Sequence, residues 1–228
     1  MRHRQQKTIA AIAILMILLC GPAMAFKFGK ISVNRGIKGS GEMETRKMDV
    51  AEFDRVDLRG AFDVEISFGK KQELKITIDD NLWDILVVEV HRGTLDLDWD
   101  ESVRPDSDCL IEIVTPSLEA IDLHGAGDID ISDFRGSSFS FNLSGAGNLT
   151  MDGEVDDLDV RLSGAGDVNT RELRAKDVEI SISGAGNAKV YASDSINGRV
   201  SGVGNLTYYG DPENKKTRVS GLGRIKQK

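Results

Sequence analysis

The residues of this sequence with the most suggestive chemistry are glycine pairs followed by Asp or Asn, in a motif that recurs six times. A glycine-rich turn beside an acidic residue is typical of phosphate-binding loops and of calcium-binding repeats. The first glycines of successive copies are 18 to 20 residues apart. The glycine pairs are Gly125 and Gly127, Gly145 and Gly147, Gly164 and Gly166, Gly184 and Gly186, Gly202 and Gly204, and Gly221 and Gly223. The residues after them are Asp128, Asn148, Asp167, Asn187 and Asn205, with Arg224 in the last copy.

Neither a nucleotide nor a metal ion is the favoured interpretation of this motif. A dinucleotide fingerprint requires a strand, a glycine-rich turn and then a helix, whereas strand-like residues follow every turn here. Calcium takes six to eight oxygen ligands, often several of them carboxylates. One acid per copy, alternating with Asn, makes a poor cage. The sequence therefore predicts structural corners with an exposed Asp/Asn ladder, and no cofactor or metal.

Catalytic groups are sparse in the rest of the chain. A polysaccharide-acting enzyme needs clustered carboxylates, but the acids are scattered, and the densest group, Asp156, Asp157 and Asp159, is expected at a turn. His91 and His124 have no evident metal-ligand partner at suitable spacing. Cys109 lies in a strand-like apolar run and is interpreted as a small buried hydrophobe. We expect a non-enzymatic protein, with the enzyme kept as an alternative.

Two adjacent aromatic residues are the remaining candidates for ligand contact. Tyr208 and Tyr209 lie just before Gly210 in a strand-like run. Neighbouring residues of a strand face opposite ways, so one of the two rings is expected at the surface. That ring is a weak candidate for stacking on a sugar.

The elements that position these residues follow from the repeat length. A period near 20 residues is about one coil of a β-solenoid, in which equivalent residues stack about 4.8 Å apart. Glycine is expected at the corners because a sharp bend needs backbone angles that it adopts easily. The residue between the two glycines is always apolar, which predicts partial burial. The residues before the motif should stack inside: Leu123, Leu143, Leu162, Ile182, Val200 and Val219.

The part of the chain before the repeats is also strand-like. Apolar and polar residues alternate from about Arg46, and LRGAFDVEI resembles a degenerate first coil. Residues 46–115 form either wider coils of the same solenoid or a separate β unit. Residues 26–45 are glycine-rich and are expected to be a flexible lead-in. The predicted solenoid domain is 46–226.

Residues 1–25 have the features of a signal peptide. A basic start precedes the apolar run Thr8 to Leu19, and Ala23-Met24-Ala25 is a small-x-small cleavage site. Cys20 follows Leu19, where lipoprotein processing favours a small residue, so cleavage is favoured over a lipid anchor. The protein is expected in the periplasm, at the cell surface or secreted.

Charge limits the classes of partner. Cleavage would remove Arg2, Arg4 and Lys7 and no acid, changing the net charge from −8 to −11. An acidic chain lacks the basic stripe that nucleic acid requires, and its overall charge disfavours anionic membrane surfaces. No later apolar run is long enough to span a bilayer.

Three segments together carry a family resemblance. The opening FDRVDLRGAFDVEI, the repeated LSGAG corners and the ending SGVGNLTYYGDP resemble the putative auto-transporter adhesin, head GIN domain family. The resemblance implies an exported, all-β, right-handed parallel β-helix of the Gram-negative envelope, and it transfers no catalytic residues. We expect a binding or adhesin-like module for a glycan or an envelope protein. A self-assembling structural module that forms oligomers is the second alternative.

Overall fold

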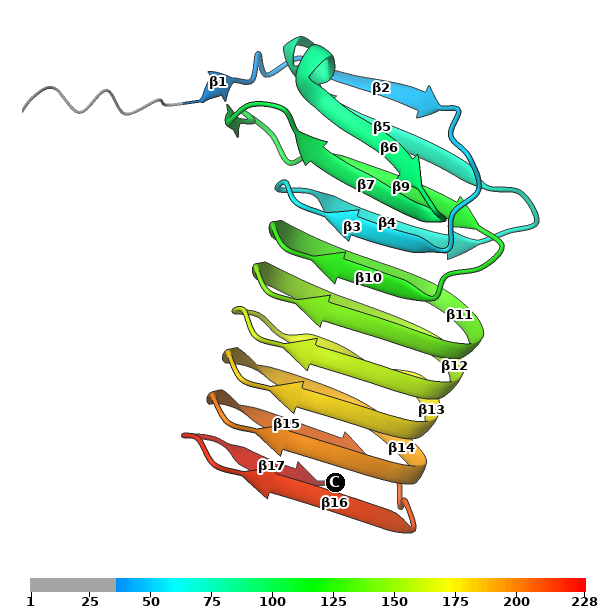
Figure 1. The fold of residues 1–228 in the computed structure, drawn as a ribbon, viewed down its shortest axis with the longest axis vertical. Helices are drawn as coiled ribbons and strands as arrows, with labels where there is room; N and C mark the ends of the chain where they lie inside the picture. The colour runs from blue at the N-terminus through cyan, green and yellow to red at the C-terminus, as the bar shows by residue number, and fades with distance from the viewer. Residues whose placement is uncertain (1–35) are drawn as a thin grey trace, which may run out of the picture. The chain divides into compact units, whose positions relative to one another are not determined.

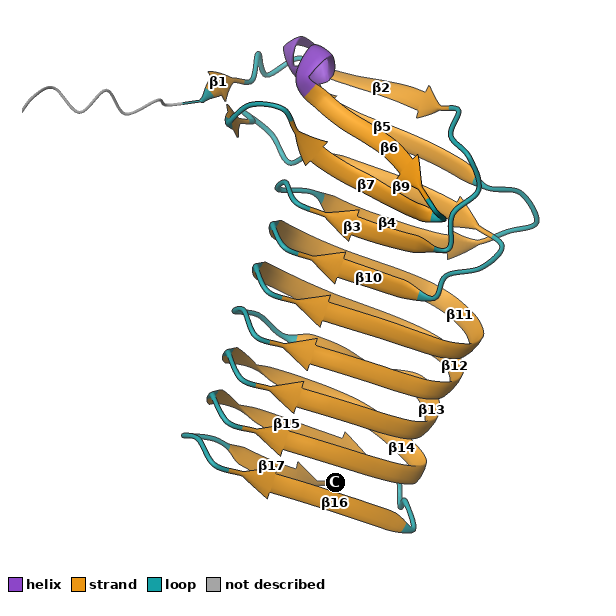
Figure 2. Ribbon diagram, viewed as in Figure 1, coloured by secondary structure: helices purple, strands orange, loops and turns teal. Residues whose placement is uncertain are grey.

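The computed structural model describes residues 36–228, most of which lie in strands (Figure 2). The predicted signal peptide lies outside the described residues. No helix in residues 36–228 is long and apolar enough to cross a membrane. The strands are β1 Ile37–Lys38, β2 Met43–Met48, β3 Arg55–Leu58, β4 Asp63–Phe68, β5 Glu73–Asp79, β6 Leu86–His91, β7 Thr94–Trp99, β8 Val103–Arg104, β9 Leu110–Thr115, β10 Ala120–Leu123, β11 Ala126–Leu143, β12 Ala146–Leu162, β13 Val168–Ile182, β14 Ala185–Val200, β15 Val203–Tyr209, β16 Asn214–Val219 and β17 Arg224–Gln227.

The predicted fold class is confirmed: the chain is an all-β solenoid of stacked parallel coils (Figure 1). Strands β11 to β14 each run through a bend and pair in parallel with the next coil along both of their halves. The front sheet contains β7, β3, β10, the C-terminal halves of β11 to β14, and β16. The back sheet contains β4, the N-terminal halves of β11 to β14, β15 and β17.

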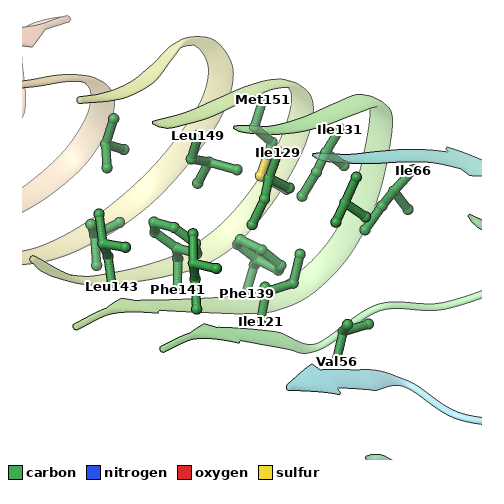
Figure 3. Close-up of a cluster of buried hydrophobic side chains, with 14 of the residues drawn as sticks. Val56, Ile66, Ile121, Ile129, Ile131, Phe139, Phe141, Leu143, Leu149 and Met151 are labelled. Carbon is green, nitrogen blue, oxygen red and sulfur yellow. The ribbon is translucent and has the colours of Figure 1, made fainter. Parts of the chain in front are cut away.

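The core lies between the two sheets, where equivalent apolar residues stack coil upon coil (Figure 3). The five inner residues Leu123, Leu143, Leu162, Ile182 and Val200 are at most 1% exposed. Val219, expected in the same ladder, is instead 42% exposed, because no further coil covers it in the described chain. A coil buries its inner face only against its neighbours, so the last one stays partly open.

The residues before the repeats continue the stack. β3 and β4 pair in parallel with β10 and β11, so LRGAFDVEI forms a coil with the corner Ala61 bridged to Ala126. Beyond this coil β2, β5 and β6 run antiparallel to their partners. A 3-10 helix, η1 (Asp80–Ile85), buries Leu82 and Trp83 against the core at this end.

Part of the expected lead-in is ordered. Within 36–45 lie β1, which pairs with β8, and the start of β2, which pairs with β5. The side chain of Asp79, fully buried, accepts hydrogen bonds from the backbone N–H groups of Gly41 at 2.6 Å and Asp106 at 3.0 Å. These bonds tie the segment to the first coils, so its glycine content does not make it a linker.

Candidate functional site

The corner glycines are required mainly by close packing between coils. A Cβ atom on Gly145 would come far inside 3.0 Å of the carbonyl oxygen of Gly125, and the same clash recurs at each later corner. The expectation that the bend angle demands glycine is correct only in part. The repeat glycines with positive φ are Gly127, Gly147 and Gly166, and the first glycine of each pair is not among them.

The residue between the two glycines points outward. Ala146, Ala165 and Ala185 are exposed, and Val203 and Leu222 are 59% and 82% exposed. The predicted partial burial is therefore wrong for these copies. The backbone of each corner bonds to the neighbouring coil, as in Ala146 N–H to Gly125 O at 2.9 Å, so the side chain has no inner space left to enter.

The Asp/Asn residues form a hydrogen-bonded ladder along the edge of the back sheet. Asp128 Oδ1 accepts from the backbone N–H of Asn148 at 3.2 Å and from its Nδ2 at 2.8 Å. Asn148 Oδ1 accepts from the N–H of Asp167 at 2.9 Å, and Asp167 Oδ1 accepts from Asn187 N–H and Nδ2 at 2.8 and 3.0 Å. Asn187 Oδ1 accepts from Asn205 Nδ2 at 2.9 Å. Alternating Asp with Asn gives most rungs of the ladder a donor as well as an acceptor.

This ladder has a structural role in the geometry observed. Its oxygens are committed to the N–H groups of the next coil, and the amides separate the carboxylates. In residues 36–228 no three Asp, Glu, His or Cys side chains converge where they could hold a metal ion. His91 and His124 lie apart: His91 bonds Glu89 at 2.8 Å and His124 bonds Ser144 at 2.8 Å.

The two candidate tyrosines have different environments. Tyr208 is 7% exposed and donates its hydroxyl to Gln227 Oε1 at 3.2 Å, so it belongs to the core and is unavailable for stacking. Tyr209 is half-buried, and the guanidinium of Arg171 lies 4.6 Å from its ring centre. The cation already covers one face of that ring.

A shallow groove of about 500 Å³ runs across the front sheet, and we call it the front groove. It spans the coils of β10 to β14, and its polar lining comes from equivalent outward positions of successive strands. These residues are Arg55, Glu119, Asp122, Ser138, Ser140, Asn142, Asp157, Asp159, Asp177, Glu179, Ser195 and Asn197.

In the front groove, the carboxyl group of Asp159 has a raised pKa. Burial raises the pKa of its carboxyl, the neighbouring Arg161 opposes this shift, and the charge of Glu179 adds to it. Arg161 Nη2 lies 2.7 Å from Asp159 Oδ2, while the buried Oδ1 has no hydrogen-bond partner among the described residues. Asp159 lies within β12, on the front sheet, and not at the turn that was expected.

Comparison with known proteins identifies the class. Residues 52–212 match the sequence profile described as putative auto-transporter adhesin, head GIN domain. The chain belongs to this family. The crystal structure of a putative adhesin from Bacteroides fragilis NCTC 9343 is 27% identical and superposes with a TM-score of 0.70, covering 85% of this chain and all of that one. A putative lipid binding protein from Parabacteroides distasonis ATCC 8503 shares the fold at 24% identity and a TM-score of 0.54, covering 84% of this chain and 99% of that one. A search of curated proteins found no match.

The front groove of this head GIN domain is suited to binding an extended ligand. Its carboxylates, amides and hydroxyls repeat about every 4.8 Å along the stack instead of converging on one point. Sequence analysis missed the groove because its lining shares no motif: each coil contributes different polar residues. One signal was available in the sequence. When the copies are aligned, the acids Asp157, Asp159, Asp177 and Glu179 fall at alternate positions that face outward from the strands.

Proposed function

We propose that the protein is a non-enzymatic, exported binding module of the adhesin type, and that the front groove binds a hydroxyl-rich glycan chain. The feature that supports this most directly is the row of outward carboxylates and amides that neighbouring coils contribute to the front groove: Asp157, Asp159, Asp177, Glu179 and Asn197. Carboxylate and amide oxygens accept hydrogen bonds from hydroxyl groups, so this row can bind several hydroxyls of one chain.

Other features of the front groove fit the same ligand. Asn142 and Asn197 each donate to a carboxylate of a neighbouring coil, at 2.7 Å to Asp122 and 3.4 Å to Glu179, which fixes their orientation. The strands underneath are hydrogen-bonded on both sides, so the lining is rigid before a ligand arrives. Preorganised polar groups lose little entropy on binding. The family name and the Bacteroides adhesin add support for a recognition role.

A glycan array probed with residues 26–228, with calcium and with a chelator, tests the proposal. We expect saturable binding to one class of neutral glycan, unchanged by the chelator. The variants Asp159→Ala and Asp177→Ala should weaken it at least tenfold. Thr150→Ala and Asn169→Ala, at outward positions of the back sheet, are the matched controls. Absence of binding, or equal losses in the controls, would overturn the front groove as the ligand site.

A further inference from the structure

The last coil of the solenoid has a charge opposite to that of the chain. Residues 214–228 contain six basic side chains and no acidic one, while the whole chain has a net charge of −8. Asp211 and Glu213 precede this segment, and with them residues 211–228 still have a net charge of +4. The basic residues are Lys215, Lys216, Arg218, Arg224, Lys226 and Lys228.

Most of these cations have no acidic partner. Lys215 pairs with Asp211 at 2.8 Å, whereas no ion pair within residues 36–228 involves Lys216, Arg218, Arg224 or Lys226. They lie on β16 and β17, which end the two sheets (Figure 1). Charged residues on edge strands commonly prevent pairing with other chains, and this alone would explain the cations.

The apolar residues at the same end need a further explanation. Among the described residues four large hydrophobic side chains are exposed, and three of them are here: Val203 at 59%, Val219 at 42% and Leu222 at 82%. Leu222 occupies the outward corner position that is alanine in the coils of β11 to β14, and its N–H bonds to Gly202 O at 3.0 Å. A rigid backbone therefore presents a leucine to solvent between Arg218 and Arg224.

We propose that this end of the solenoid docks on an anionic lipid surface, with Leu222 entering the interface and the cations of β16 and β17 facing the headgroups. An exposed apolar residue on a basic coil combines the two forces that hold proteins at membrane surfaces: apolar burial and attraction to anionic lipid. Repulsion from the acidic remainder falls off along the stack. The acidic hairpin β6–β7 is at the opposite end, and Asp177 and Glu179 on β13 lie two strands from β16, about 10 Å away at the usual strand spacing, while the Debye length in physiological salt is about 8 Å.

Lipid binding would leave the front groove free, because the groove lies on the outer face of the front sheet and not at its end. The inference therefore does not depend on the glycan proposal, and either can fail without the other.

Vesicle co-sedimentation of residues 26–228 tests the inference, since removing residues 1–25 removes the apolar run Thr8 to Leu19. We expect binding to vesicles containing phosphatidylglycerol, weakened by salt, and little binding to phosphatidylcholine alone. Leu222→Ser should lower the partition constant about tenfold, given the apolar area withdrawn. Arg218→Gln with Arg224→Gln should lower it about 30-fold, since each cation near an anionic surface contributes about 1 kcal/mol.

The matched control is Lys70→Gln with Lys71→Gln, which removes two exposed cations from the loop between β4 and β5, at the other end of the stack. It should bind within about twofold of the unmodified chain by the same rule. Equal binding to both vesicle types, or an equal loss in the control, would overturn the proposal. So would sedimentation velocity in the absence of lipid showing that this end holds a second copy, with Leu222→Ser dissociating it.

Discussion

The carbonyl oxygen of Gly145 lies so close to Gly164 in the next coil that a Cβ atom on Gly164 would come well within 3.0 Å of it, and the same oxygen accepts a hydrogen bond from the Ala165 N–H at 3.0 Å. The same relationship joins each corner to the one before. At the corners, the backbones of successive coils are therefore in direct contact. Glycine is required there because the coils stack so closely, and not because of the local turn geometry. A side chain at any level would separate two coils that are hydrogen-bonded on both sheets.

Gly164→Ala is accordingly expected to be severely destabilising. The methyl group meets backbone atoms that cannot move without breaking the pairing of β12 with β13, so we expect a loss of about 3 kcal/mol or more in unfolding free energy, or no folding. Urea denaturation followed by circular dichroism measures this. Ala165→Ser, at the exposed neighbouring position, should stay within about 0.5 kcal/mol. A Gly164→Ala protein of unchanged stability would show that the coils separate easily.

The repeat period predicted much of this fold because stacking turns a sequence spacing into a spatial register. Leu143, Leu162 and Ile182 had to share one interior column once the corners were aligned. The same alignment places Tyr208 in the column of Met151, Thr170 and Val190. Its burial could therefore have been predicted from the alternation of inward and outward residues. The antiparallel strands and η1 at the other end follow no period and gave no comparable signal.

The front groove could not be predicted in the same way. Packing constrains the inner column to apolar residues of suitable size, whereas the outward residues face solvent and vary freely. Ser140, Asp159, Glu179 and Asn197 occupy one outward column of the groove, and they are a hydroxyl, two carboxylates and an amide with no shared motif.

Asn148→Asp should destabilise the ladder at neutral pH. The change removes the Nδ2 donor to Asp128 and places three carboxylates in consecutive coils, at an expected cost of about 1–2 kcal/mol. Their mutual repulsion would destabilise the charged folded state and would be relieved when the carboxyl groups are protonated. The deficit relative to the unmodified chain should therefore be largest near neutral pH and shrink in acid.

Urea denaturation of both proteins between pH 3 and 8, roughly the range over which carboxyl groups titrate, measures the difference. Asn169→Asp is the control, because its ladder neighbours are Thr150 and Lys189. It should show little loss at neutral pH. A deficit in Asn148→Asp that persisted at low pH would mean that charge repulsion is not its cause.

Cys109 should be unreactive in the folded protein. Its side chain is 2% exposed, and burial, followed by the charges of Asp79, Asp108 and Asp63, raises the pKa of the thiol to about 12. Only the thiolate reacts with a disulfide reagent. In the chain without residues 1–25 it is the only thiol, so we expect labelling by a colorimetric disulfide at pH 8 to follow the unfolding rate and to accelerate in urea. Immediate stoichiometric labelling without urea would contradict this.

Asp211→Asn should loosen the last coil selectively. At the surface of this coil a polar network links the segment before β16 to β17: Lys215 Nζ donates to Asp211 at 2.8 Å and to Gln227 Oε1 at 3.3 Å, and Gln227 Nε2 donates to Gly210 O at 3.0 Å. Without the carboxylate, Lys215 loses its charged partner. Backbone amides of β16 and β17 should then exchange hydrogen faster, while those of β12 and β13 stay unchanged.

The same network predicts the direction of a pH effect. The hydrogen bond from Lys215 lowers the pKa of Asp211 below its ordinary value, so its stabilisation is full above the unfolded pKa, near 4, and is lost as the pH falls through the lower folded value. After correction for intrinsic exchange, the excess protection of β16 and β17 over Asp211→Asn should therefore disappear on acidification. Glu213→Gln, which removes an exposed acid that forms no ion pair within residues 36–228, should behave like the unmodified chain at every pH. Equal amide hydrogen exchange of β16 and β17 in Asp211→Asn and Glu213→Gln would contradict this prediction. It would mean that β pairing alone holds the end of the solenoid and that the network around Lys215 adds no stability.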